Sequence, residues 1–367
     1  MADPRLTTWA KTLVEYSVRL EPGKLAVIAG GVAAQPLMRA IHKEVVLAGA
    51  HPVVVPSFSG LGAELLTHGS DEQLTWISPI EDLLRTKADV LFNIMADTNT
   101  KSMASVDPAR QQLFSGARAE LMRMFLERDA RDELRWCLTL YPTDAFAQDA
   151  DLSTADFSDF VFDACHLNDA DPVARWREQS AEQQRLIDWL QGKSEVRLTG
   201  PGTDLTMSVA GRVWINADGT HNFPDGEIFT GPVETSASGT VAFTYPVVTA
   251  GREIADIVLR FEGGKVVDAR ASKGEDYLVS TLDTDEGARY LGELAFGTNF
   301  SIQRFSKNIL FDEKIGGTVH MAVGAGYPLT GSSNQSAVHW DMICDLRQGG
   351  RIEVDGEPFL VDGRYVV

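Results

Sequence analysis

The sequence has few cysteines, no long hydrophobic run and no excess of basic residues. Its three cysteines are widely spaced among 367 residues and form no CxxC pair. A disulfide framework and a cysteine-type zinc site are therefore excluded, and a reducing compartment is favoured. No apolar run approaches the roughly 18 residues of a membrane span. The first residues lack the basic and apolar regions of a signal peptide. We expect a cytoplasmic protein with no membrane partner.

Positive charge is also scarce. Lysine and arginine number 33 against 52 acidic residues, which leaves a formal net charge of −19. A nucleic-acid partner is not expected, because binding to phosphates needs a basic surface. Phosphate-binding motifs are missing too, since neither GxGxxG nor GxxxxGK[ST] follows the first predicted strand. The Gly30-Gly31 pair that ends this strand indicates a tight turn.

The sequence contains enough apolar residues for a large core, and its two halves show different patterns. Hydrophobic residues make up 44% of the chain. In the first half, predicted strands alternate with predicted helices, which is typical of an α/β domain with a mainly parallel sheet. The predicted strands are 25–30, 52–56, 90–95 and 136–140, and the predicted helices include 33–49, 108–128 and 171–191.

After Gly192 the predicted segments become short, β-rich and separated by glycines. Gly263-Gly264 lies between two such runs and predicts a hairpin turn. We therefore predict two domains, an α/β domain over residues 1–192 and an α+β, β-rich domain over residues 193–367. The candidate chemistry lies in the second domain.

Two predicted strands of this domain carry histidines. In the strand 338–342, His339 and Asp341 alternate with Trp340, so the imidazole and the carboxylate share one face. The strand 317–324 carries His320 between small residues, which leaves room beside its ring. A histidine on an apolar strand is often a core residue, but the His-x-Asp strand downstream favours a metal site.

Two acidic residues extend this set. Glu227 follows a loop rich in glycine and proline, at the point where an apolar strand begins. Glu293 lies in the run 290–297, which we predict to be a short helix, with apolar neighbours on both sides. A carboxylate is seldom buried unless it is paired or binds a metal. A surface position or a salt bridge is the alternative for each, and it is the weaker one for Glu293.

Carboxylates and imidazoles without a thiolate suit Zn, Mn, Co or Fe(II). Three carboxylates and two imidazoles exceed what one tetrahedral ion with an open position needs. The surplus predicts two metal ions that share a carboxylate, with an activated water between them.

Four runs of the sequence together resemble one enzyme family. They are NFPDGEIFTGP, DEGARYLGELAFGTN, DEKIGGTVHMAVGAGYP and SAVHWDMICDLR, which occur in this order and cover most of residues 220–347. They are similar to the thermophilic aminopeptidases, also called the aminopeptidase T or M29 family. The first half of the chain is compatible with this family.

The resemblance implies a dinuclear metallo-aminopeptidase, usually a homodimer, that releases N-terminal amino acids from peptides with a free N-terminus. Its cofactors would be two divalent ions per chain, such as Zn, Co, Mn or Mg. The implied ligands are Glu227, Glu293, His320, His339 and Asp341, with Glu293 as the bridging carboxylate.

The same resemblance implies two further residues near the metals. Glu313 resembles a family acid that is a candidate ligand or base, although it lies farther from His320 than in some members. Tyr327 resembles a family tyrosine that contacts the reacting group. Several members have a long insertion where this chain has the short segment 328–337, which we expect to border the substrate pocket.

An alternative belongs to another reaction class. Ring-cleaving dioxygenases that act on hydroxypyridines resemble the same fold. Two histidines and one carboxylate form the facial triad of mononuclear Fe(II) oxygenases. His320, His339 and Asp341 would satisfy that triad, and the presence of both Glu227 and Glu293 favours two metals and hydrolysis instead.

Overall fold

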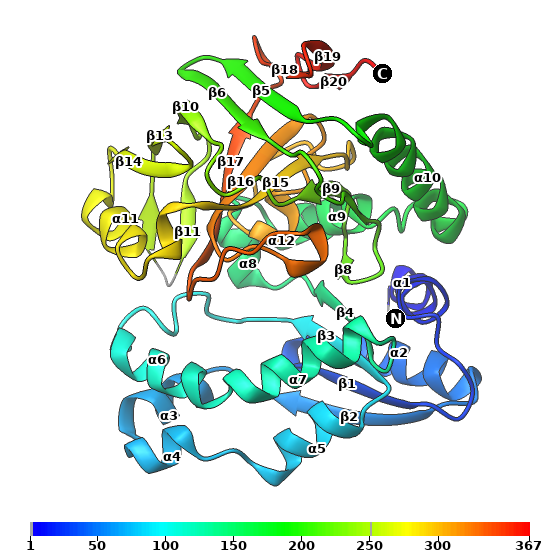
Figure 1. Ribbon diagram of the computed structural model, residues 1–367. Helices are drawn as coiled ribbons and strands as arrows, with labels where there is room; N and C mark the ends of the chain where they lie inside the picture. The colour runs from blue at the N-terminus through cyan, green and yellow to red at the C-terminus, as the bar shows by residue number, and fades with distance from the viewer. Residues whose placement is uncertain (1–2, 250–251) are drawn as a thin grey trace. The chain divides into compact units, whose positions relative to one another are not determined.

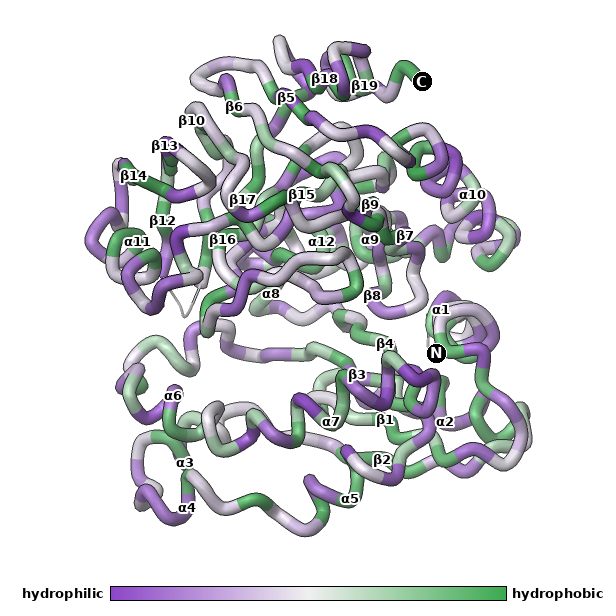
Figure 2. Tube along the Cα trace, viewed as in Figure 1, coloured by the Kyte–Doolittle hydropathy of each residue, from purple (hydrophilic) through white to green (hydrophobic). Residues whose placement is uncertain are grey.

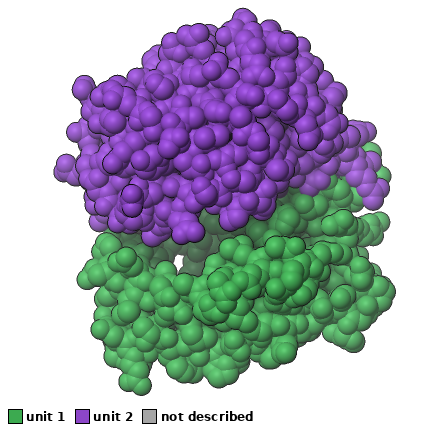
Figure 3. Space-filling view, in the orientation of Figure 1, with its two compact units in different colours: residues 1–173, 219–224 green, residues 174–218, 225–367 purple. Residues whose placement is uncertain are grey.

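The computed structural model describes residues 3–249 and 252–367. Its chain forms two compact units, shown in Figure 3. Unit 1 comprises residues 1–173 and 219–224, and unit 2 comprises residues 174–218 and 225–367. In the described ranges, no helix is both long enough and apolar enough to cross a bilayer.

Unit 1 is built on a five-stranded sheet in which every pair of neighbours is parallel. The spatial order is β2-β1-β3-β4-β8. The strands are β1 (Leu25–Gly31), β2 (His51–Ser57), β3 (Val90–Met95), β4 (Arg135–Leu140) and β8 (Asn222–Phe223). The predicted parallel sheet is thus present, and β8 joins it from a segment that lies far along the chain.

Helices connect the strands of unit 1 (Figure 1). Helix α2 contacts β1 and β2, and Phe125 of α7 packs near Val27 of β1. The helices are α1 (Arg5–Thr12), η1 (Leu13–Ser17), η2 (Val32–Ala34), α2 (Gln35–Leu47), α3 (Leu61–His68), α4 (Asp71–Thr75), α5 (Pro79–Lys87), α6 (Pro108–Ala117), α7 (Ala119–Ala130), α8 (Asp144–Asp149) and α9 (Thr154–Ala164).

The single helix predicted over 108–128 is wrong, because the chain forms α6 and α7 instead. Arg118 separates the two helices with φ −98° and ψ 0°. Its guanidinium donates to the carbonyl oxygens of Leu74 and Phe114 and pairs with Glu81. These tertiary contacts fix a break that the local sequence pattern does not reveal.

Unit 2 is β-rich and contains two larger antiparallel sheets. The eight-stranded sheet has the order β14-β13-β10-β6-β5-β18-β19-β20. Its strands are β5 (Glu195–Gly200), β6 (Thr203–Ser208), β10 (Ser238–Ala242), β13 (Val258–Glu262), β14 (Lys265–Arg270), β18 (Arg351–Val354), β19 (Glu357–Val361) and β20 (Arg364–Tyr365). The hairpin predicted at Gly263-Gly264 is confirmed, since β13 and β14 pair as antiparallel neighbours.

The second sheet of unit 2 has five strands in the order β17-β16-β15-β9-β7. They are β7 (Ile215–Ala217), β9 (Glu227–Thr230), β15 (Leu291–Gly297), β16 (Thr318–Gly324) and β17 (His339–Asp345). A separate hairpin pairs β11 (Val247–Thr249) with β12 (Arg252–Ile254). The helices are α10 (Pro172–Leu190), α11 (Glu275–Leu282), α12 (Ile309–Asp312), η3 (Gly287–Arg289) and η4 (Pro328–Thr330).

The run around Glu293 is a strand, so the short helix predicted there is wrong. All seven residues of β15 are buried, and the strand pairs with β9 on one side and β16 on the other. A strand whose two faces are both covered shows no alternation of polar and apolar residues. Its local sequence therefore resembles that of a short buried helix.

Helix α10 packs mainly with unit 2, although it precedes residue 192. Figure 2 shows it as largely hydrophilic with a few hydrophobic positions. Leu186, Ile187 and Leu190 supply that apolar face and belong to the core of unit 2. The compact units therefore divide near Val173. The domains 1–192 and 193–367 stay a prediction, because compactness alone does not define a domain.

Candidate metal centre

Four neighbouring strands bring the five predicted ligands onto one face of the second sheet. Glu293 of β15 lies opposite Ala322, which in turn lies opposite Asp341. Because side chains alternate along a strand, His320 shares the face of Ala322, and His339 shares that of Asp341. Glu227 begins β9, which pairs with β15 on its other side. Sequence-distant residues thus meet through strand register.

The two histidines point at different oxygens of Glu293. His320 Nε2 lies 3.9 Å from Glu293 Oε1 and 3.2 Å from Glu227 Oε2. His339 Nε2 lies 3.2 Å from Glu293 Oε2 and 3.7 Å from Asp341 Oδ2. Glu293 therefore has one oxygen toward each histidine, as a bridging carboxylate requires.

Ligand atoms of the predicted residues cluster in three overlapping groups, each within 4.8 Å. The first group holds Glu227, Glu293 and His320, and the second holds Glu293, His339 and Asp341. Glu293 belongs to both. The third group joins Glu313 to His320 and Asp341. The structure thus brings Glu313, at the end of α12, to the same place in spite of its greater sequence distance from His320.

Contacts to the backbone hold Glu227 in position. Gln183 of α10 is 1% exposed, and its amide donates to the carbonyl oxygens of Ala217 and Glu227, each at 2.9 Å. Gly226 precedes Glu227 with φ +123°, and a Cβ there would lie 2.6 Å from Asn299 Cβ. Only glycine fits this position without displacing its neighbours.

A carbonyl oxygen orients the imidazole of His339. Its Nδ1 lies 2.8 Å from the carbonyl oxygen of Ala325. An Nδ1–H that donates to this oxygen leaves the lone pair on Nε2, which faces Glu293 and Asp341. The side chain is 28% exposed, so this end of the cluster is open to solvent.

Lys314 is a member of the site that the sequence reasoning missed. Its side chain has no exposed surface. Its Nζ bonds to Glu313 and lies 3.6 Å from Glu227 Oε1 and 4.0 Å from Asp225 Oδ1. A lysine is rarely fully buried unless paired. Its position between Glu313 and an apolar strand was the available signal.

Tyr327 lies beside His339 at the rim of the cluster. Its ring is 5.1 Å from the ring of His339 and 5.4 Å from that of Phe229, centroid to centroid. Loss of contact with water, together with the negative charges of Glu293 and Asp341, raises the pKa of Tyr327. The phenol therefore keeps its proton at neutral pH and is available as a donor.

Burial has opposite effects on the acids and on His320. Burial raises the pKa of Glu227 well above its ordinary value and that of Asp341 to about 8, and neighbouring carboxylates add to both shifts. Burial likewise lowers the pKa of His320. For His339 burial is outweighed by the hydrogen bond that its ring N–H donates to Glu293 and by the negative charge of Asp341, which raise the pKa to about 9. A cation bound among these groups would remove the penalty of ionising the carboxylates.

Two carboxylate oxygens fit a metal particularly well. Glu227 Oε2 and Asp341 Oδ1 are buried, and neither accepts a hydrogen bond from the described part of the chain. Buried polar atoms without a partner are costly in a folded protein. Together with two imidazoles and no thiolate nearby, this donor set suits divalent ions that take nitrogen and oxygen ligands.

Comparison with known families decides the identity of the fold. The sequence profile of the thermophilic metalloproteases (M29) matches residues 2–365. The chain belongs to the M29 family. The predicted family and the prediction of a metallo-aminopeptidase are therefore confirmed, and the M29 family implies a divalent metal cofactor.

Relatives of this M29 enzyme have been named as aminopeptidases. Aminopeptidase 2 of Geobacillus stearothermophilus is 29% identical over 419 residues, covering 99% of this chain and 98% of the relative. Aminopeptidase T of Thermus aquaticus is 34% identical over 233 residues, covering 56% of this chain and 55% of the relative.

Two solved structures share the fold of this M29 enzyme. Wild-type AmpT from Thermus thermophilus aligns with a TM-score of 0.88 at 24% identity, covering 99% of each chain. The 2,5-dihydroxypyridine dioxygenase of Pseudomonas putida KT2440 aligns with a TM-score of 0.59 at 11% identity, over 99% of this chain and 97% of the other. At these identities the likeness concerns the fold alone.

Proposed function

We propose that this enzyme removes N-terminal amino acids from peptides and uses two divalent ions to do so. The ions would be held by Glu227, Glu293, His320, His339 and Asp341. The observation that carries the proposal is the position of Glu293. Its two oxygens face two different histidines, and each histidine has a further carboxylate beside it. A single ion would need only one of these two groups of a histidine and its carboxylates.

The charge of the cluster supports two ions independently. Five carboxylates lie around it, against the single ammonium group of Lys314. When all are ionised and both imidazoles are neutral, as metal ligation requires, four negative charges stay uncompensated in a mostly buried region, and two divalent ions would balance them. The carboxylates are those of Asp225, Glu227, Glu293, Glu313 and Asp341.

The chain's own residues would divide the remaining work. When bound, divalent ions supply Lewis-acid activation of water and of the scissile carbonyl. Glu313 would accept the proton lost by the attacking water and pass it to the leaving amine. Tyr327 would donate its phenolic hydrogen to the developing oxyanion, a contribution of about 3 kcal/mol in comparable sites. The surrounding carboxylates would attract the free ammonium group of the peptide.

Metal content and hydrolysis, measured on the same samples, test the proposal. The wild-type protein should bind about two ions per chain after chelation and re-addition of Zn, Co or Mn, and should hydrolyse aminoacyl-7-amido-coumarins. Glu293→Gln and His339→Ala should lose metal and activity together. His68→Ala, a change on the exposed end of α3, is the matched control. Full hydrolysis by Glu293→Gln would refute the assignment.

The same measurement addresses the oxygenase alternative. A mononuclear iron enzyme that uses His320, His339 and Asp341 would bind about one Fe(II) and leave Glu227 without a ligand role. The burial of Glu227, 6% exposed beside His320, favours the two-metal proposal.

We further propose that the enzyme is a cytoplasmic homodimer. The location rests on the scarcity of cysteine. For the dimer, support comes from β2, an edge strand whose Val53 and Val54 are 40% and 44% exposed. An apolar edge strand is a ready surface for pairing. Light scattering after gel filtration should give twice the 40.1 kDa chain mass.

A further inference from the structure

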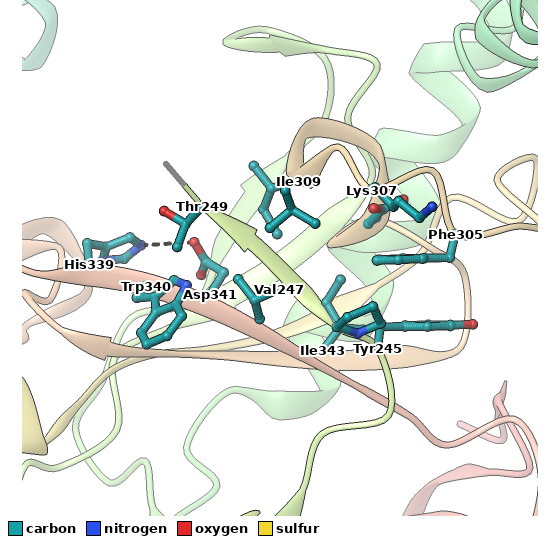
Figure 4. A pocket seen from close by; sticks show the side chains of 13 residues that line it. Tyr245, Val247, Thr249, Phe305, Lys307, Ile309, His339, Trp340, Asp341 and Ile343 are labelled. Atoms are coloured by element: carbon teal, nitrogen blue, oxygen red, sulfur yellow. Dashed lines mark ion pairs between the residues drawn. The ribbon is translucent and has the colours of Figure 1, made fainter. Parts of the chain in front are cut away.

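A pocket of about 200 Å³ opens beside the candidate metal ligands of unit 2. His339 and Asp341 contribute to its wall at one end (Figure 4). Tyr245 and Phe305 lie at the other end, and Ile309 stands between the two ends. The segment 328–337 contributes no lining residue among those described, although we expected it to border the substrate pocket.

The walls of this pocket are mainly apolar. Three elements supply them, namely β11 with the residues before it, the segment leading into α12, and β17. The apolar and aromatic lining residues are Tyr245, Pro246, Val247, Val248, Phe305, Ile309, Trp340 and Ile343. Such a lining favours an apolar ligand group, since water is released from both surfaces on binding.

Fixed contacts hold the far end of the pocket. The rings of Tyr245 and Phe305 stack with centroids 4.7 Å apart and planes at 2°. The Tyr245 hydroxyl donates to Asp345 at 3.0 Å and accepts from Arg347 at 2.6 Å. These bonds prevent the ring from swinging away, so the pocket has a defined depth.

The wall that carries Ile309 is anchored in a similar way. The buried carboxylate of Asp312 accepts from the backbone N–H and the hydroxyl of Ser306, at 2.7 and 2.8 Å. On the opposite side, the N–H of Thr244 donates to the carbonyl oxygen of Ile343 at 3.0 Å and ties the start of the β11 segment to β17. The pocket is therefore preformed.

We propose that this pocket binds the side chain of the substrate's first residue and favours large apolar side chains, either aromatic or branched aliphatic. The inference rests on the proposed function. Its volume suits one side chain rather than a stretch of peptide, since a cavity of roughly 150 Å³ already holds benzene. Because His339 and Asp341 line one end of it, a side chain inside it belongs to a residue at the reacting centre.

Substitution of Ile309 tests this inference. Its side chain is 46% exposed, so a larger residue can be introduced without overpacking the core. Ile309→Trp should fill the pocket and lower the ratio of kcat/KM for phenylalanyl over alanyl amido-coumarin by about tenfold or more. Val267→Trp, on the exposed face of β14, is the matched control and should leave the ratio unchanged.

A second variant and a second substrate pair make the outcome decisive. Ile309→Ala adds no bulk and should also lower the ratio, though by less, because one apolar wall is lost. The dipeptides Phe-Ala and Ala-Phe separate the first residue from the second. An unchanged ratio in both Ile309 variants, or an effect confined to Ala-Phe, would overturn the inference. Failure of the wild type to hydrolyse any substrate would instead refute the proposed function, and this inference with it.

Discussion

At Lys314 a positive charge is enclosed completely within the second unit, next to Glu227 and Glu313. Desolvation alone would favour the neutral amine, but the surrounding carboxylates outweigh it and raise the pKa of Lys314. The ammonium group is therefore retained at neutral pH. It compensates carboxylates that would otherwise repel one another whenever no cation is bound.

Replacement of Lys314 by methionine should therefore destabilise the metal-free protein far more than the metal-loaded protein. Loss of one partner from a buried charge cluster typically costs about 3–5 kcal/mol. Added Zn or Co should recover part of this loss by supplying positive charge. Thermal unfolding in chelator and in excess metal measures both effects.

The control for this variant is Lys273→Met. That lysine is 61% exposed and pairs with Glu253 at 3.0 Å, so its loss should change the melting temperature little. Equal melting temperatures for Lys314→Met and the wild type in chelator would show that the buried ammonium does not compensate the acids.

In unit 2, β15 and the turn after β16 approach each other closely at Gly292. A Cβ on this residue would lie 2.2 Å from the carbonyl oxygen of Ala325, which is the hydrogen-bond acceptor for His339. The register between β15 and β16 also shifts between Leu291 and Glu293. The absence of a side chain at Gly292 thus affects two ligands at once.

Gly292→Ala should reduce metal affinity by roughly 10–100-fold while the protein stays folded, because the acceptor of His339 is displaced. Activity measured against free metal concentration gives the affinity. Gly62→Ala serves as the control, since no atom lies within 4 Å of a Cβ there. Wild-type affinity in Gly292→Ala would mean that the carbonyl does not position the imidazole.

A second link between elements is Glu234, which ties the loop after β9 to residues 332 and 333. Its carboxylate accepts from the N–H and hydroxyl of Ser333 at 2.7 and 3.0 Å and pairs with Arg212 at 2.6 Å. Partial burial opposes ionisation, but these bonds and this charge prevail and lower the pKa of Glu234 to about 2.

Because the folded pKa lies below the ordinary value of 4.5, Glu234 stabilises the fold above that pH. The contribution declines as pH falls from 4.5 toward 2. Glu234→Gln should therefore cost about 1–2 kcal/mol at pH 7, after allowance for solvent screening, and progressively less below pH 4.5. Urea unfolding at pH 7, 4.5 and 3 checks this trend. A difference that does not change with pH would contradict it.

Sequence patterns predicted much of this arrangement. The His-x-Asp alternation in β17 and the strand carrying His320 are local features, so their faces could be assigned directly. The apolar neighbours of Glu293 correctly indicate a buried acid, but the same pattern predicts a helix where the chain forms β15, because burial of both faces removes the alternation. The position of Lys314 between Glu313 and an apolar strand is its only local signal. The apolar residues that line the pocket, such as Tyr245 and Ile309, have no such signal, since their role depends on tertiary contacts between distant segments.

The net charge of −19 of the whole molecule and the acidic cluster both favour the binding of cations. Metal ions that bind only the folded chain stabilise it by about 4 kcal/mol at a concentration 1,000 times their Kd. Chelation should therefore lower the melting temperature, and re-addition of Zn, Co or Mn should restore it. Calorimetry measures the shift, and an unchanged transition in chelator would contradict ion binding in the folded state.

The central position of β15 makes the metal site depend on the pairing of strands from distant parts of the sequence. Its neighbours β9 and β16 come from segments far apart in the chain, so the ligand set is complete only after long-range pairing. An unfolded chain cannot assemble residues 227 to 341 around an ion. Uptake of ions into the complete site should therefore follow the closure of this sheet, so that ion retention reports correct strand pairing.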